Sequence, residues 1–198
     1  MTLQLRNEFI FAPIKLGYSD ATGIITEKHL DFYRRRSKHI GAVTLEPLYM
    51  EPGLRELSTQ LGIDNNNKLD GLKKMTNIIH SDGAKVISHL NHPGRMANPK
   101  IPGNYFWSST DRACENEGAI PEKMNREMME KVTNLFVESA KRAVVADFDL
   151  IELQLGHGYL LAQFISPAVN KRDDEYGGNF ENRIRFPLEV AKAVREAI

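Results

Sequence analysis

The sequence predicts an α/β fold made of four strand–helix units whose strands form one parallel sheet. Short apolar segments alternate along the chain with longer segments in which apolar residues recur at helical spacing. Long polar segments follow the strands, whereas the connections from each helix to the next strand are very short. Since the loops after the carboxyl ends of strands build the site in α/β folds, we expect the functional residues there.

The first two units begin with short apolar strands, predicted over 9–15 and 42–48. Parallel strands that are covered by helices read as short apolar runs of this kind. The first unit continues with a helix over 27–39, and the second with a helix over 68–83 that has an apolar face. Gly83 is a suitable residue to end the second helix.

The last two units repeat this order with strands predicted over 84–90 and 149–155. A long helix over 125–148 lies between them, and Asn125 is its candidate N-cap. The final helix is predicted over 181–198. Parallel neighbours need a crossover connection, and these helices supply it.

The polar segments that follow the strands are 16–26, 49–67, 91–124 and 156–180. Long irregular loops in compact domains are usually functional. The segment 91–124 is the longest of the four, so we expect it to form a lid or an insertion.

Four units amount to half of a (β/α)8 barrel, the TIM-barrel fold, which typically needs about 250 residues. Each unit occupies roughly a quarter of the chain, so eight units would need about twice its length. An open sheet of four strands would expose an edge and an apolar face. Two architectures are therefore open for the single domain 1–198: a complete doubly wound sheet, or a half-barrel that lacks its partner.

Composition narrows the class of protein. The chain has 198 residues, a formal net charge of zero and 41% hydrophobic residues, which describes one soluble globular domain. The balanced charge argues against a nucleic-acid partner, and no apolar run is long enough to span a membrane. The N-terminus lacks the features of a signal or transit segment, so a cytoplasmic location is expected. Cys114 is the only cysteine, which excludes an internal disulfide and a thiolate metal cluster.

Several side chains near the strand ends invite chemical interpretations. Glu46 and Glu152 could form the acid–base pair of a glycosidase, but a sugar site needs an aromatic lining and Trp107 is the only tryptophan. We therefore favour paired structural carboxylates. His89 and His92 lie three apart, yet they leave a strand rather than a helix and no third ligand stands out. No metal site is predicted.

Tyr159 and His157 follow the fourth strand closely. A tyrosine hydroxyl can deliver a proton to a reacting carbon, and a neighbouring histidine can hold and polarise a substrate oxygen. Structural tyrosines and histidines are commoner than catalytic ones, so these two residues alone leave both interpretations open.

A long motif then points to a family. GHGYLLAQFISPAVNKRDDEYGGNFENRIRF (156–186) resembles the signature of the old yellow enzyme family of FMN-dependent oxidoreductases, in its NADH:flavin oxidoreductase and enoate reductase branch. The resemblance covers most of the chain, because further segments match the family's earlier strands and loops. These segments are NEFIFAPIK (7–15), EPLYMEPGLR (46–55), SHLNHPGR (88–95) and ADFDLIELQLGHGY (146–159).

The resemblance implies a (β/α)8 barrel that holds FMN at the strand ends, takes hydride from NADH or NADPH and reduces an activated C=C bond. Tyr159 would donate the proton to the α-carbon, and His157 with Gln154 would hold the carbonyl oxygen of an activated alkene or enone. Residues expected to contact the flavin are Ala12, Pro13, Ile14, Lys15, Pro47 and His89. The resemblance also implies that Arg172, Asp173 and Tyr176 fix the loop after the fourth strand. Asn182, Arg183 and Arg185 would anchor the last helix.

Three departures from the family pattern stand out. Gln154 replaces the usual histidine of the substrate-binding pair, and Gln can donate a hydrogen bond but cannot become cationic. His89 replaces the glutamine that usually meets the flavin pyrimidine. Asp147 and Leu150 replace two glycines at the turn into the fourth strand.

The family's phosphate site and its flavin-contacting arginine come from the second half of the barrel. The chain therefore resembles the N-terminal half of an FMN-binding barrel, and we expect it to form a homo-oligomer or to pair with a second half-barrel. An alternative is a catalytically inactive, truncated barrel or interaction module without a complete FMN site. Flavin colour separates the two interpretations.

Overall fold

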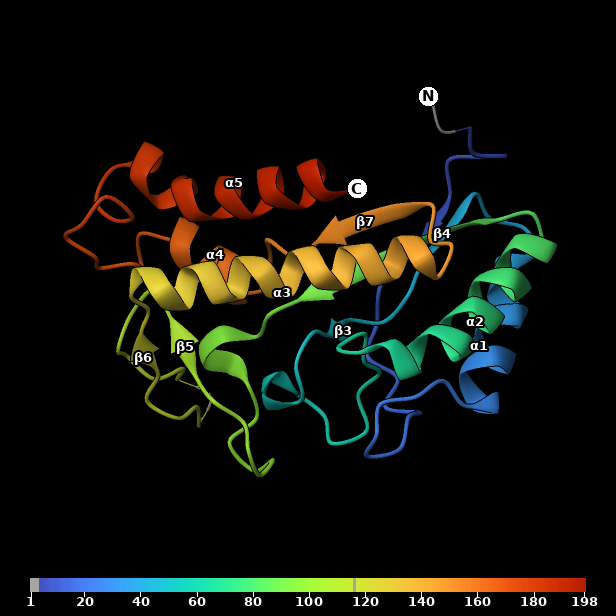
Figure 1. The fold of residues 1–198 in the computed structure, drawn as a ribbon, viewed down its shortest axis with the longest axis horizontal. Helices are drawn as coiled ribbons and strands as arrows, with labels where there is room; N and C mark the ends of the chain where they lie inside the picture. The colour runs from blue at the N-terminus through green and yellow to red at the C-terminus, as the bar shows by residue number, and fades with distance from the viewer. Residues whose placement is uncertain (1–3, 116) are drawn as a thin grey trace.

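The computed structural model describes residues 4–115 and 117–198, and its main sheet is entirely parallel (Figure 1). Its strands are β1 (Ile10–Phe11), β2 (Ala42–Thr44), β3 (Leu48–Tyr49), β4 (Lys85–Asn91) and β7 (Leu150–Leu153). β2 and β3 both pair with β4, and β7 pairs with the same strand along its other edge. The predicted strand 42–48 is thus one strand in two pieces.

The order of the strands decides between the two predicted architectures. Counting β2 and β3 together, the four strands lie side by side in the order in which they occur in the sequence. A doubly wound sheet would reverse its order at a switch point. The alternative of a complete doubly wound sheet is therefore wrong, and the fold is of the TIM-barrel type with four βα units.

Each strand is followed by the helix that the sequence predicts. These helices are α1 (Glu27–Ser37), α2 (Leu69–Ser81), α3 (Arg126–Val145) and α5 (Phe180–Ala197). In Figure 1, α1 and α2 lie side by side at one end of the sheet, and α5 lies along α3 beside β7.

The predicted helix ends are confirmed by local geometry. Gly83 has φ +81°, a left-handed conformation that glycine adopts without steric cost after a helix. The Asn125 side chain accepts a hydrogen bond from the backbone N–H of Met128 at 2.9 Å and so caps α3.

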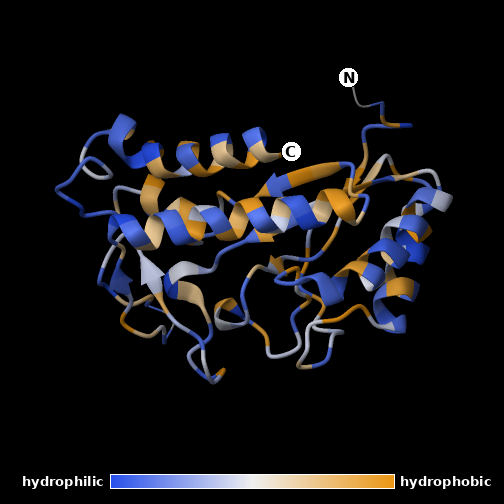
Figure 2. Ribbon diagram, viewed as in Figure 1, coloured by the Kyte–Doolittle hydropathy of each residue, from blue (hydrophilic) through white to orange (hydrophobic). Residues whose placement is uncertain are grey.

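The hydrophobic core lies between the sheet and the helices. Figure 2 shows the strands of the main sheet as mostly apolar and the helices as alternating apolar and polar turns. Fully buried side chains come from strands and helices alike, among them Val43, Val86, Leu72, Met75, Phe136 and Phe186. The helices bury one face against the sheet and are therefore amphipathic, whereas successive residues of β2 and β4 are buried, which suits apolar strands.

Three short elements were not predicted. Within 91–124, β5 (Trp107–Ser108) and β6 (Glu122–Lys123) form a small parallel sheet. Helix α4 (Leu160–Ile165) lies within the segment predicted as polar loop. Two-residue strands and a six-residue helix are too short to show a periodic pattern in the sequence. Single turns of 3₁₀ helix at Pro52–Leu54, Asn66–Lys68 and Gly94–Met96 complete the described structure. None of the described helices is both long and apolar enough to cross a bilayer.

Candidate active site at the carboxyl ends of the strands

The loop after β7 has a backbone in the left-handed region at two consecutive residues. His157 has φ +55° and Gly158 has φ +76°. Left-handed backbone is uncommon for residues other than glycine and clusters at functional sites. The turn leaves His157 exposed and buries Tyr159 to 7% exposure at the start of α4, with 6.3 Å between the two ring centroids.

A row of polar side chains crosses from β4 to this loop. Gln154 Nε2 lies 3.2 Å from Nε2 of His89 and 3.3 Å from Nδ1 of His157. Gln154 Oε1 accepts from the backbone N–H of Gly156 at 2.8 Å, which fixes the orientation of the amide. Because Nε2 of an amide only donates, both ring nitrogens must accept.

This hydrogen-bond pattern sets the tautomers of the two histidines. His89 carries its proton on Nδ1, which donates to the carboxylate of Glu152. Burial lowers the pKa of His89, although the carboxylate opposes this, so the ring is neutral. His157 accepts through Nδ1, which leaves its Nε2–H as a donor on an exposed ring.

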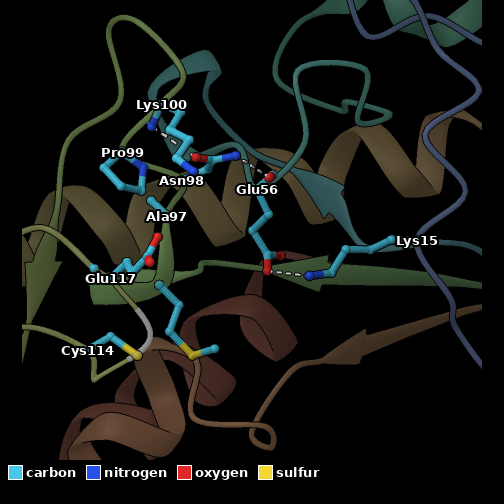
Figure 3. Close-up of a pocket in the computed structure, with 10 residues that line it drawn as sticks. Lys15, Glu56, Ala97, Asn98, Pro99, Lys100, Cys114 and Glu117 are labelled. Carbon is cyan, nitrogen blue, oxygen red and sulfur yellow. Dashed lines mark hydrogen bonds and ion pairs between the residues drawn. The ribbon is translucent and has the colours of Figure 1, made fainter.

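Tyr159 also meets two charged residues from distant segments. The Lys15 ammonium lies 5.5 Å from the centroid of the Tyr159 ring and 2.5 Å from Oε2 of Glu56. Figure 3 shows Lys15 and Glu56 pointing toward one another. Asn91 Nδ2 donates to the other carboxylate oxygen at 3.0 Å, so Glu56 is held from β4 as well. Burial raises the pKa of the Tyr159 phenol, and the ammonium partly opposes this.

Lys15 and Glu56 form one wall of a cavity of about 340 Å³. The opposite wall comes from the segment after β4 (Figure 3). Its lining residues there are Met96, Ala97, Asn98, Pro99, Lys100, Cys114, Glu117 and Gly118. The segment predicted as a lid or an insertion therefore lines a cavity beside the candidate site.

Gln163 of α4 joins the parts of this site, and the sequence reasoning missed it. Its amide donates to the carbonyl oxygens of Pro93 (3.1 Å) and Gly158 (2.7 Å) and accepts from Ser108 Oγ at 2.8 Å. Gly94 is left-handed, and a Cβ there would lie 2.3 Å from Gln163 Oε1. The sequence signal was a polar residue within the largely apolar stretch YLLAQF, and the structure shows that this residue is fully buried.

The residues predicted to contact a flavin fall into two groups. Ala12 and Ile14 are exposed and Pro13 is half-buried, so they offer an apolar strip that ends at Lys15. Pro47 and His89 are buried, and His89 reaches the site only through Gln154. An apolar strip beside polar donors suits a planar ring with polar edge atoms. The segment 12–15 and the polar row thus fit the flavin that the motifs imply.

Burial and pairing bear on the other chemical interpretations as well. Glu46 is fully buried, and its carboxylate lies 3.0 Å from Nε2 of the equally buried His29. The preference for a structural carboxylate is therefore confirmed at Glu46. Complete burial lowers the pKa of His92 to about 3, and its Nδ1 accepts from Gly94 N at 3.1 Å. No group of metal-ligating side chains occurs in the part of the chain that the structure describes.

One residue role is corrected. Asp173 is 96% exposed and lies 3.7 Å from Lys123, so it does not fix the loop after β7. Its neighbour Asp174 does, since it accepts two hydrogen bonds from Arg172 Nε and one from the Tyr176 backbone N–H. Because Asp173 and Asp174 are adjacent, the sequence did not show which of the two pairs with Arg172.

The predicted anchors of the last helix are confirmed. Arg183 Nε donates to the carbonyl oxygen of Ile165 at 2.8 Å, and Arg185 Nε donates to that of Glu175 at the same distance. Arg185 Nη2 also donates to Oδ1 of Asn182 at 2.9 Å. These bonds tie α5 to the loop that carries the candidate site.

Sequential parallel strands with a polar site at their carboxyl ends define the class: a domain of the TIM-barrel type with an active-site rim. The chain belongs to the NADH:flavin oxidoreductase / NADH oxidase family, whose family model matches residues 1–198. It is 33% identical to an NADH oxidase of Thermoanaerobacter brockii and 33% identical to an NADH:acrylate oxidoreductase of Vibrio harveyi. The crystal structure of old yellow enzyme from Pichia sp. AKU4542 matches with a TM-score of 0.91 at 30% identity.

The chain spans about half or less of the proteins that it matches. The alignments include 99% of this chain and 31% of the Thermoanaerobacter relative, and 98% of this chain and 20% of the Vibrio relative. The match to the Pichia structure covers 99% of this chain and 54% of that one.

Proposed function

We propose that this chain forms the N-terminal half of an FMN-dependent oxidoreductase that reduces an activated C=C bond. The observation that carries the proposal is the convergence of residues from four strand ends on one rim. Lys15 follows β1, Glu56 follows β3, His89 lies on β4, and Gln154 with Tyr159 follows β7. Family membership supports the same chemistry.

When bound, the flavin would take hydride from NADH or NADPH and pass it to the β-carbon of the alkene. Along the rim, the Nε2–H of His157 donates a hydrogen bond to the substrate's carbonyl oxygen, and the Gln154 amide orients that ring. The Tyr159 hydroxyl delivers a proton to the α-carbon. A neutral donor polarises the oxygen less than a cationic one, so we expect substrates that are already well activated.

Two observations support a proposal for the substrate class: the cavity that Lys15 and Glu56 line beside the candidate site, and the name of one relative. A volume of about 340 Å³ lies at the small end of ligand pockets, and its walls carry lysine and glutamate side chains. The Vibrio relative is named for acrylate, a small α,β-unsaturated carboxylate. We therefore propose small polar alkenes conjugated to a carbonyl or carboxylate group.

The first test is flavin retention. The protein is mixed with FMN, excess flavin is removed, and the visible absorption spectrum is recorded. Retained flavin that NADH or NADPH reduces and an enone or acrylate reoxidises would bear out the proposal. Ile14→Glu, on the exposed strip, should lose the flavin, whereas Leu188→Glu, at a 47% exposed position on α5, should keep it.

The alternative is a barrel half without catalytic activity. Burial of Pro47 and His89 favours it, because two of the predicted flavin contacts offer little surface to a ligand. A colourless protein that stays colourless after mixing with FMN would support this alternative and contradict the proposal for the chain by itself.

We also propose that the open side of the sheet binds a second barrel half, either another copy of this chain or a separate chain. β7 pairs along one edge only within the described residues, and a groove of about 320 Å³ lies between it, α3 and α5. A further parallel strand and its helix would fill this position in a complete barrel.

A further inference from the structure

Lys15 and Glu56 connect the buried phenol of Tyr159 to solvent. Tyr159 is 7% exposed, the Glu56 side chain 7% and the Lys15 side chain 33%. The ammonium lies beside the Tyr159 ring at 5.5 Å from the centroid and forms an ion pair with Glu56. Of these three side chains, that of Lys15 is the most exposed to water, and its ammonium lies beside the Tyr159 ring.

This ion pair is built more firmly than an ordinary surface pair. The Glu56 backbone N–H donates to Gln60 Oε1 at 2.8 Å, and Asn91 holds the carboxylate at 3.0 Å. By contrast, the pair between Lys74 and Glu27 is 58% and 81% exposed. Surface pairs of that kind contribute little, whereas a fixed charge near a buried phenol acts on it strongly.

We propose that the Lys15–Glu56 pair sets the acidity of Tyr159 and supplies its replacement proton. This inference rests on the proposed function. As the α-carbon accepts the phenol proton with its own electron pair, the ammonium stabilises the phenolate that forms. Lys15 then transfers one proton to the phenolate oxygen, and the neutral amine takes a proton from water, which restores both residues.

The electrostatics of the cluster keep the Lys15 ammonium charged, as stabilisation of the phenolate requires. Burial works to lower the pKa of Lys15, but the hydrogen bond and charge of Glu56 leave it above its ordinary value. Glu56 also raises the pKa of Tyr159, whereas Lys15 lowers it. His157 is the remaining titratable group beside the phenol. Lys15 and Glu56 are thus positioning residues that act in opposite directions on the same phenol.

The test is a pH titration of Tyr159 by ¹³C-tyrosine NMR, with Tyr159→Phe used to assign its resonance. Lys15→Met should raise the midpoint by about one pH unit or more, and Glu56→Gln should lower it. Lys74→Met, which removes a lysine from a surface pair, should leave it unchanged. This measurement needs neither flavin nor substrate, so its failure is distinct from failure of the proposed function.

A kinetic measurement complements the titration. In flavin-loaded protein, Lys15→Met should slow alkene reduction about tenfold, in proportion to the weaker acidity of the phenol. Lys15→Arg keeps the charge and should recover much of the single-turnover rate.

An unchanged Tyr159 midpoint in folded Lys15→Met or Glu56→Gln would overturn the inference, as would an equal shift in Lys74→Met. If Lys15→Met does not fold, Glu56→Gln decides the question through the direction of its shift.

Discussion

At the scale of single residues, a neutral amide connects the two histidines of the candidate site. Gln154 donates to His89 and His157 at once, and the carboxylate of Glu152 fixes the far end of the row. A histidine at position 154 could become charged, but Gln cannot. Gln154 thus connects the row without carrying a charge itself.

Tyr159 is the residue whose role is most directly testable. In flavin-loaded protein, Tyr159→Phe should slow alkene reduction by about 10²-fold or more, because the proton donor is lost. Flavin reduction by the nicotinamide cofactor needs no proton from this phenol and should change little. Stopped-flow measurement of the two half-reactions separates these effects. Equal slowing of both would remove Tyr159 from the donor role.

At the scale of elements, the turn from α3 into β7 places a residue other than glycine in a left-handed backbone conformation. Asp147 has φ +64°, a conformation that favours glycine, at the position after the helix cap where glycine is commonest. Asp147 and Leu150 stand where the family pattern has two glycines at this turn. In the structure Asp147 adopts the left-handed backbone conformation itself.

Asp147→Gly should therefore stabilise the fold by about 0.5–1 kcal/mol. The loss of the 3.7 Å contact with His80 should matter little, because Asp147 is 76% exposed. Gly83→Ala is the matched control, since it puts a Cβ on a residue with φ +81° after α2 and should destabilise by about 1 kcal/mol. Urea unfolding measures both. A less stable Asp147→Gly would contradict the assigned strain.

At the scale of the whole molecule, the sheet has an open side next to β7. Apolar side chains that remain exposed around this edge include Val144 (51%), Val145 (53%), Leu150 (39%) and Ile198 (40%). They line or adjoin the groove between β7, α3 and α5. Clustered exposed apolar residues beside an unpaired strand edge mark a surface that binds another chain.

We expect the protein to self-associate, and light scattering over a range of concentrations measures this. Leu150→Lys should shift the population toward monomer, because it places a charge on the open edge. Ile120→Lys, at a 78% exposed position in the 91–124 segment, should leave the association unchanged. A compact monomer at every concentration would contradict the prediction.

The sequence by itself determined the four strand–helix units, their parallel sheet, the caps at Gly83 and Asn125, and the family. These follow from periodicity, turn chemistry and a long motif, all of which are local in the chain. It also predicted that the functional residues lie in the loops after the strands. In the loop after β7, the rings of Tyr159 and His157 lie 6.3 Å apart.

Only the tertiary structure decided how distant segments combine. The sequential strand order, the link from Lys15 and Glu56 to Tyr159, and the central place of Gln163 depend on contacts across 41 to 144 positions of the chain. Likewise, the burial of Glu46 against His29 and the exposure of Asp173 were unreadable from residue type. Charge pairing and burial depend on which side chains pack against one another. The strand ends bring these side chains together only after the sheet has formed.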